Sequence, residues 1–289
     1  MKALIRQAVA ALALLIALPA LAQVAGTVEA VQMPAWVQRA GGRLPVLPGT
    51  PLRAGDQVVT GAGARLQIKL AEGSVVKLGE DAQMTFVEVA ARTDLFKAAL
   101  DVLQGAFRFT TDIVSKAQTR REVSVRVGQV TAGIRGTDLW GRSRAGNEIV
   151  CLIEGEIEVG AQGEPAVKMD HPLQFYRRID NRAQPVGNVD SVQLAQWSLE
   201  TDLEMGKGVL RQGGRYGVIL ASFPEQAGAL AMYDELRSAG YPAEIWPVKE
   251  ADKIAYRVRI RHLPSRSEAQ ALGGSLRGKF GITEPRVSG

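Results

Sequence analysis

The sequence predicts a chain of two domains, an all-β domain followed by a small α+β domain. Three observations support this fold class. Short runs of alternating apolar and polar residues recur from residue 23 to about residue 186, and glycine-containing turns separate them. The period then changes to that of a helix, and several glycines follow. From residue 215 onward the patterns have the order strand, helix, strand, strand, helix, strand.

Residues 1–22 have the pattern of a secretory signal peptide. Lys2 and Arg6 precede an apolar run that Pro19 ends, and residues 20–22 then read Ala-Leu-Ala, a small-x-small cleavage pattern. The apolar run is shorter than the roughly 20 residues of a membrane-spanning helix, which favours cleavage over an uncleaved anchor. We therefore expect a mature chain that begins at Gln23 and is located in the periplasm.

Composition excludes few classes of function. Hydrophobic residues make up 46% of the 289 residues, which is enough for a packed core. The net charge of +5 falls to about +3 when Lys2 and Arg6 are removed. This mild bias suits a polyanionic or wall-like surface and does not indicate nucleic-acid binding. Cys151 is the only cysteine, and its apolar neighbours predict a buried structural thiol.

The region 23–186 has the alternation of a β domain throughout. Period-2 runs occupy residues 27–31, 66–70, 74–78, 123–127 and 157–159, and they predict strands with one buried face. Strands this short and evenly spaced fit a roll, a sandwich or a short solenoid. The segment 96–103 fits a helical turn as well as a strand.

The region 187–214 is expected to connect the two domains. Its first part, residues 190–205, predicts a helix capped by Asp190 or Ser191, with one apolar face. That face would consist of Val192, Ala195, Leu199 and Leu203. Four glycines between residues 206 and 214 then predict a flexible joint.

The region 215–289 predicts an open four-stranded antiparallel sheet with two helices on one face. Strands are expected at 216–222, 243–248, 255–261 and 284–287, and helices at 225–239 and 265–279. Gly240 is a stop signal for the first helix, and Ser265 with Glu268 forms a capping-box pattern for the second. The other sheet face is left open to a ligand.

Alternation predicts which side chains occupy the open face. On the strand at 255–261 three arginines point outward, because Val258 and Ile260 between them face the helices. Such a row is typical of a solubilising strand as well as of a ligand-binding one, and Trp246 fits a stacking platform or a core position. The candidate ligand-binding residues are Ile219, Ala221, Ser222, Trp246, Arg257, Arg259 and Arg261.

Residues 215–289 resemble a SPOR domain. The segment 216–223, YGVILASF, is similar to the family's first strand, Val-Gln-x-Gly-Ser-Phe, and 256–260, YRVRI, is similar to Tyr-Arg-Val-x-Val. The resemblance implies that the open face binds peptidoglycan, typically glycan strands stripped of stem peptides. Two departures bear on this: Ile219 stands where the family usually has Gln, and Arg261-His262 replaces Gly-Pro. Either departure weakens or redirects glycan recognition.

Residues 23–186 resemble a FecR domain. The most specific block is 130–138, VTAGIRGTD, which is similar to the family's Pro-x-Gly-x-x-x-Val-Arg-Gly-Thr core. Within it, Gly133 and Gly136 predict a tight bend and Arg135 a structural role. Some relatives are sigma regulators with a cytoplasmic tail and a membrane helix, and neither pattern occurs here. The resemblance therefore implies a periplasmic module for protein contacts or display.

Together these features predict a non-enzymatic periplasmic protein that binds peptidoglycan and contacts another envelope protein, with no cofactor, no metal and no nucleic acid. His171 and His262 are the only histidines and lie in different domains, and no phosphate-binding or dinucleotide-binding fingerprint occurs. Two alternatives stay open. One is a periplasmic component of a cell-surface signalling system, and the other is a wall hydrolase whose carboxylate pair the sequence does not reveal.

Overall fold

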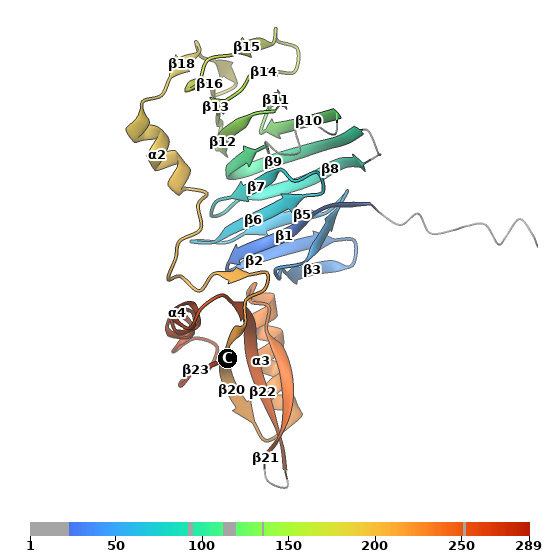
Figure 1. Cartoon of the computed structure of the whole chain (residues 1–289), viewed down its shortest axis with the longest axis vertical. Helices are drawn as coiled ribbons and strands as arrows, with labels where there is room; N and C mark the ends of the chain where they lie inside the picture. The colour runs from blue at the N-terminus through green and yellow to red at the C-terminus, as the bar shows by residue number, and fades with distance from the viewer. Residues whose placement is uncertain (1–22, 92–94, 112–119, 135, 251–252) are drawn as a thin grey trace, which may run out of the picture.

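The computed structural model describes residues 23–91, 95–111, 120–134, 136–250 and 253–289, so the expected signal peptide lies outside the described residues. Figure 1 shows a stack of strands, β1 to β19, and a smaller module at one end of the stack that contains β20 to β23. The architecture thus has a largely β N-terminal part and few helices, as the sequence predicts.

The β domain consists of two sheets that share strand β9 (Leu95–Thr110) and enclose an apolar core. Sheet A contains β1 (Val24–Gln32), β4 (Pro51–Arg53), β6 (Arg65–Leu70), β7 (Val75–Leu78), β12 (Asp138–Arg144), β13 (Asn147–Glu154), β16 (Gln174–Ile179), β17 (Arg182–Ala183), β18 (Gly187–Asn188) and β19 (Leu210–Arg211). Sheet B contains β2 (Ala35–Arg39), β3 (Gly42–Pro45), β5 (Gln57–Thr60), β8 (Gln83–Ala91), β10 (Arg120–Val127), β11 (Val130–Ile134), β14 (Ile157–Ala161) and β15 (Val167–Met169).

The chain passes repeatedly between the two sheets, and the strands stack largely in chain order. Strand β9 makes one of these crossings without a break. Its first part pairs with β8 and β10, and its last six residues pair with β7 and β12. Gly105 lies where β9 passes from one sheet to the other. It has φ +89°, and a Cβ there would come within 2.4 Å of Ala82. Only glycine fits this bend. The segment 96–103, which the sequence left open, is therefore a strand.

Helix α2 (Ser191–Leu199) covers part of the outer face of sheet A. Asp190 caps it by accepting the Gln193 N–H at 2.8 Å, as expected. The predicted apolar face is wrong, because Val192 and Leu199 are 68% and 67% exposed. The residue that packs is Trp197, whose ring stacks on Trp140 at 4.7 Å with an interplanar angle of 6°. An aromatic pair buries more apolar area here than the small aliphatic side chains would.

Cys151 lies under this helix in a small cluster with Trp140, Trp197 and Ile149, and it is fully buried, as predicted. Burial raises the pKa of the Cys151 thiol from 9.0 to about 12, and the charge of Asp138 adds to the effect. In the unfolded chain the thiol ionises near its ordinary pKa. Its contribution to stability is therefore complete below about pH 9 and is lost as the pH rises toward about 12.

We predict that the difference in free energy of unfolding between wild type and Cys151→Ala falls above pH 9. The expected slope is about 1.4 kcal/mol per pH unit, because one thiol proton is released on unfolding. Urea unfolding of both proteins at several pH values between 7 and about 10.5 measures it. The alanine variant is the control for the lysines and tyrosines, which titrate in both proteins. A difference that stays constant with pH would contradict the prediction.

The C-terminal module has the expected order of elements: β20 (Tyr216–Phe223), α3 (Gln226–Ser238), β21 (Glu244–Glu250), β22 (Lys253–Leu263), α4 (Arg266–Leu276) and β23 (Arg286–Ser288). The strands form one antiparallel sheet in the order β21-β22-β20-β23. Val218, Val258 and Ile260 are buried in the core with residues of both helices. The helices thus cover one face and leave the other open.

The connection between the two parts is bonded to both of them. Glu268 of α4 is 1% exposed and accepts the N–H groups of Gly206 at 2.7 Å, Gly208 at 2.7 Å and Val209 at 3.0 Å. Strand β19 then pairs with β1 of the β domain. The predicted capping box is only half formed, since Ser265 accepts the Glu268 N–H while the Glu268 carboxylate holds the connection. The expected flexible joint is an ordered segment.

The C-terminal module also touches the β domain directly. Trp36 Nε1 donates to the Ser238 carbonyl at 3.2 Å, and the Ala35 N–H donates to the Gly240 carbonyl at 3.4 Å. Gly240 has φ +86°, and a Cβ there would lie 2.6 Å from the Trp36 ring. The predicted helix stop therefore has a second role, because it lets the end of α3 approach the indole closely.

Candidate functional site

The open face of the C-terminal sheet collects most of the residues that the sequence singles out. Across β21 and β22, Trp246 is opposite Arg257, and Glu244 is opposite Arg259. Across β22 and β20, Arg259 is opposite Ile219. Opposite residues on paired strands share a face. Trp246 is 39% exposed, so it is a surface side chain and the core alternative is excluded.

Trp246 is held by a charged neighbour. The guanidinium carbon of Arg259 lies 4.0 Å from the centre of the Trp246 ring, and that of Arg257 lies 5.8 Å from it. Arg259 Nε also donates to Glu244 Oε1 at 2.6 Å, and the Arg259 side chain is only 16% exposed. Arg259 is therefore fixed between a carboxylate and an indole. Its place in the fold suits positioning of the ring more than contact with a ligand.

A groove of about 550 Å³ runs beside β20 on this part of the module. Ile219, Ser222 and Arg257 line one side of it, and Glu284 and Arg286 line the other. Arg286 pairs with Ile219 across β20 and β23, and its guanidinium is 3.8 Å from the Glu284 carboxylate. The groove thus combines two guanidinium groups, one carboxylate, the hydroxyls of Ser222 and Thr283, and several apolar side chains.

Bulges interrupt the alternation at two of the predicted site residues. Ala221 is opposite Val258 and packs against the core, because a bulge after Ile219 interrupts the alternation of β20, and it also lines the groove. Arg261 lies at the end of β22 nearest the β domain, next to a second bulge where His262 has φ +69°. That both side chains contact a ligand stays a prediction. Strict alternation holds only between bulges.

Sequence reasoning missed Glu244, Glu284 and Arg286. Glu244 could have been found, since it lies two residues before Trp246 and alternation puts both on one face. Glu284 and Arg286 were missed because the last strand was predicted at 284–287, whereas the structure has it at Arg286–Ser288.

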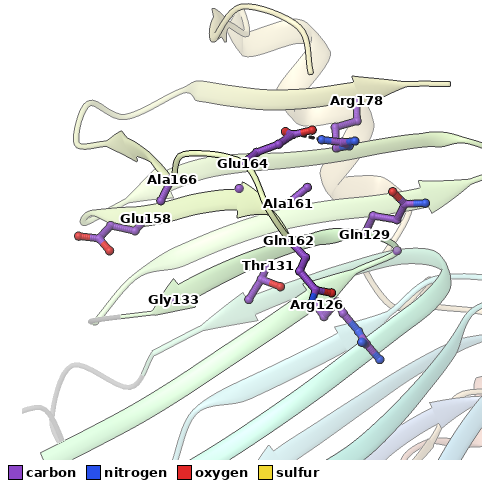
Figure 2. A pocket seen from close by; sticks show the side chains of 12 residues that line it. Arg126, Gln129, Thr131, Gly133, Glu158, Ala161, Gln162, Glu164, Ala166 and Arg178 are labelled. Atoms are coloured by element: carbon purple, nitrogen blue, oxygen red, sulfur yellow. Dashed lines mark hydrogen bonds and ion pairs between the residues drawn. The ribbon is translucent and has the colours of Figure 1, made fainter. Parts of the chain in front are cut away.

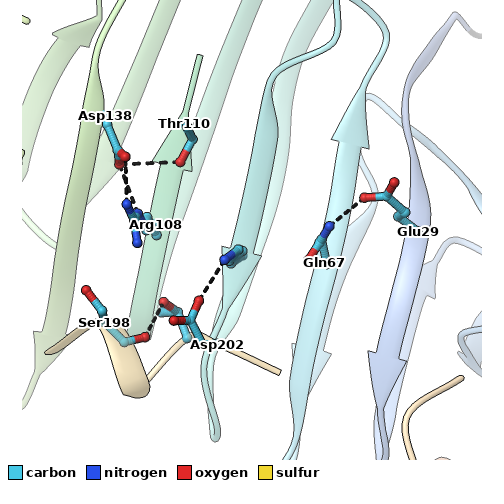
Figure 3. A network of polar contacts seen from close by, with 9 residues as sticks. Glu29, Gln67, Arg108, Thr110, Asp138, Ser198 and Asp202 are labelled. Carbon is cyan, nitrogen blue, oxygen red and sulfur yellow. Dashed lines mark hydrogen bonds and ion pairs between the residues drawn. The ribbon is translucent and has the colours of Figure 1, made fainter. Parts of the chain in front are cut away.

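The motif at 135–138 has a structural role in the β domain. Arg108 binds the Asp138 carboxylate through Nε at 3.0 Å and Nη2 at 2.7 Å, and the bond to Asp138 raises the pKa of Arg108. Thr110 also donates to Asp138, and Figure 3 shows this network on sheet A. Gly136 has φ +72° and makes the expected bend, whereas Gly133 lies within β11. Arg135 lies outside the described residues.

A second hollow, of about 820 Å³, lies on the β domain (Figure 2). Thr131, Gln129 and Glu158 line it, as do two arginines. Arg126 is bonded to Asp101 through Nε at 2.9 Å, and Arg178 Nη1 is bonded to Glu164 at 2.5 Å. Both guanidinium groups are thus neutralised by protein carboxylates, and no aromatic side chain lines the hollow. The open face of the C-terminal sheet is the better candidate for a ligand site.

Within the described part of the chain, no group of three or more His, Cys, Asp or Glu side chains is placed to hold a metal ion. Among the same residues, no helix is both long and apolar enough to cross a membrane.

Comparisons with known proteins identify both parts of the chain. Residues 56–158 match the family model described as FecR protein, and residues 212–283 match the SPOR domain. Two crystal structures described as a candidate anti-sigma factor from Parabacteroides distasonis are also similar, both with a TM-score of 0.40. One is 15% identical and aligns over 69% of this chain and 98% of its own; the other is 14% identical and aligns over 72% and 99%. A comparison with curated proteins found no match.

Proposed function

Because the chain carries a FecR domain followed by a C-terminal SPOR domain, we propose that it is a non-enzymatic periplasmic protein that binds peptidoglycan glycan strands through the open face of the SPOR sheet. The FecR domain serves protein contacts or signalling in the envelope. Export by a cleaved signal peptide is part of the same proposal.

The observation that carries the proposal is the exposed Trp246 ring beside arginines and a groove. A sugar ring stacks well on an indole, and a guanidinium group donates to hydroxyls and to lactyl carboxylates with fixed geometry. Arg257 supports this best, since it lines the groove and lies near Trp246. Arg259 contributes by holding the ring, and Arg286 adds a second guanidinium to the groove.

Ile219 sets the polarity of the groove. The side chain lies between Arg259 and Arg286 on the neighbouring strands. A glutamine there would add a donor and an acceptor among the guanidinium groups. The isoleucine therefore favours a less polar part of the glycan, such as an acetyl methyl group.

We predict that Trp246→Ala and Arg257→Ala each weaken binding to purified sacculi. Loss of the stacking surface is expected to raise the Kd at least about 10-fold. Loss of a charged hydrogen bond is expected to raise it about 10- to 150-fold, with the lower end more typical of wet sugar sites. Co-sedimentation of the mature protein with sacculi over a range of concentrations measures the change.

Arg266→Ala is the matched control, because Arg266 is exposed at the start of α4, on the covered side of the sheet. It should bind as wild type does, and Ile219→Gln should bind more tightly if the glutamine of the family contributes. Equal binding by all folded variants would exclude the open face. Release of soluble muropeptides by wild type would support the hydrolase alternative instead.

The signalling role of the FecR domain is tested separately. Cross-linking of the full chain in the envelope, with wall-binding variants included, should capture the same membrane partner whether or not Trp246 is present. Capture that depends on Trp246 would mean that the wall and not the FecR domain brings the two proteins together.

A further inference from the structure

A pocket of about 460 Å³ lies where the two domains meet. We call it the junction pocket. Leu47, from the turn after β3 of the FecR domain, forms part of its apolar wall together with Leu230, Tyr233 and Ile245 of the SPOR domain. The other lining residues also come from the SPOR domain: Arg237, Pro242, Ala243, Glu244, Arg261 and His262. The docked FecR domain therefore completes a pocket that belongs mostly to the SPOR domain. It is separate from the groove beside β20, with which it shares no lining residue.

Two guanidinium groups border this apolar wall. Arg237 lies over the Tyr233 ring at 5.1 Å, and among the described residues it has no ion-pair partner. Arg261 is 51% exposed, and its Nε is 3.9 Å from Glu244. Glu244 is bound much more closely by Arg259, at 2.6 Å. The junction pocket thus keeps an excess of positive charge next to apolar surface.

The bulge at the end of β22 places one of these charges here. Leu263 is opposite Tyr216 and Ile260 is opposite Val218, so Arg261 and His262 together oppose a single residue of β20. Bulges of this kind redirect side chains. Both residues line the junction pocket and neither lines the groove beside β20.

We propose that the junction pocket binds a peptide segment of a partner protein in which a large apolar side chain lies next to a carboxylate. The apolar wall accommodates the side chain, and the two arginines bind the carboxylate with paired hydrogen bonds. The volume is within the range of sites that enclose a small ligand. A glycan fits less well, because its hydroxyls would lose water against aliphatic side chains without regaining hydrogen bonds.

The two histidines supply the readout for a test on the full mature chain. His262 lines the junction pocket, and His171 lies on the distant β16 end of the FecR domain, where it is exposed. A His171→Gln variant assigns their ring signals in proton NMR. Titration with acetyl-Leu-Phe should shift the His262 signals and leave those of His171 unchanged. The same dipeptide with an amidated C-terminus should bind at least about 10-fold more weakly, since it lacks the charge.

Matched variants locate the binding. Arg237→Ala and Arg261→Ala should each weaken acetyl-Leu-Phe at least about 5-fold, whereas Arg266→Ala should not. Leu47→Asp tests the contribution of the FecR domain and should weaken binding of the dipeptide. Leu230→Asp, at a side chain that is already 41% exposed, tests the apolar wall of the SPOR domain and should weaken it too. Arg237→Ala should keep its binding to sacculi, which separates this proposal from the wall-binding one.

Equal affinity for the acid and the amide would overturn the proposal, as would shifts confined to His171. A chito-oligosaccharide that shifts His262 more strongly than the dipeptide would also overturn it, since the site would then belong to the glycan.

Discussion

Replacement of Glu268 by alanine is expected to lower the free energy of unfolding by about 3–5 kcal/mol. The carboxylate accepts three backbone N–H groups of the connection between the domains, and two of the three donor residues, Gly208 and Val209, are buried. Without the carboxylate these donors lose their partner in a place that water does not readily enter. Urea unfolding measures the loss. Limited proteolysis should show faster cutting between residues 206 and 214 in the variant than in wild type.

Glu225→Ala is the matched control for this effect. Glu225 occupies the N-cap position of α3, is exposed, and makes no capping hydrogen bond with its side chain. Its removal should change stability by no more than about 0.5 kcal/mol. Glu268→Gln keeps one acceptor, so its loss of stability should be intermediate between those of Glu268→Ala and Glu225→Ala. If Glu268→Ala were as stable as wild type and as resistant to proteolysis, the connection would not need the carboxylate.

Trp197→Ala is the second large effect that we expect. The ring stacks on Trp140 and meets Phe175 edge-on at 6.0 Å, and it is the one buried side chain of α2. Truncating a buried tryptophan typically costs about 3–5 kcal/mol. Because α2 is short and its other contacts are few, such as the partly buried Leu194 and the Arg142–Glu200 ion pair, we expect it to detach locally before the sheets unfold.

Cys151 reports this opening, because it lies beneath the helix and is the only thiol. Its labelling by a maleimide at pH 8 should be at least about 100-fold faster in Trp197→Ala than in wild type, which corresponds to about 2.7 kcal/mol of lost protection. Trp246→Ala is the control, since that ring is exposed in the other domain. Unchanged labelling in Trp197→Ala would show that Cys151 is protected by the sheet alone.

The sequence pattern predicted correctly those features that depend on residues close together in the chain. Period-2 alternation gives the buried face of a strand directly, so Val258 and Ile260 lie in the core as predicted. Gly240 ends α3 and Asp190 caps α2 because these signals act within one turn of helix. The two family patterns likewise lie in single strands and turns, and both were recognisable before the fold was known.

The candidate site was predictable only in part. Ile219, Trp246, Arg257 and Arg259 share the open face because alternation holds between bulges. The alternation breaks at Ala221 and after Arg261 because a bulge is set by the register between two strands, which neither strand encodes alone. Arg286 was missed for a related reason, since pairing with β20 decides where the last strand begins.

By itself the sequence determined the class of each domain, the order of the elements in the SPOR domain and the outward face of its central strand, because short-range periodicity and turn chemistry control these. Only the tertiary structure decided which face of α2 is buried, since Trp140 of sheet A selects Trp197 over Val192 and Leu199. It also decided the role of Glu268. The same four-residue pattern can cap its own helix or bind another segment, and the N–H groups of Gly206, Gly208 and Val209, brought close by the docked domains, offer the carboxylate three donors instead of one.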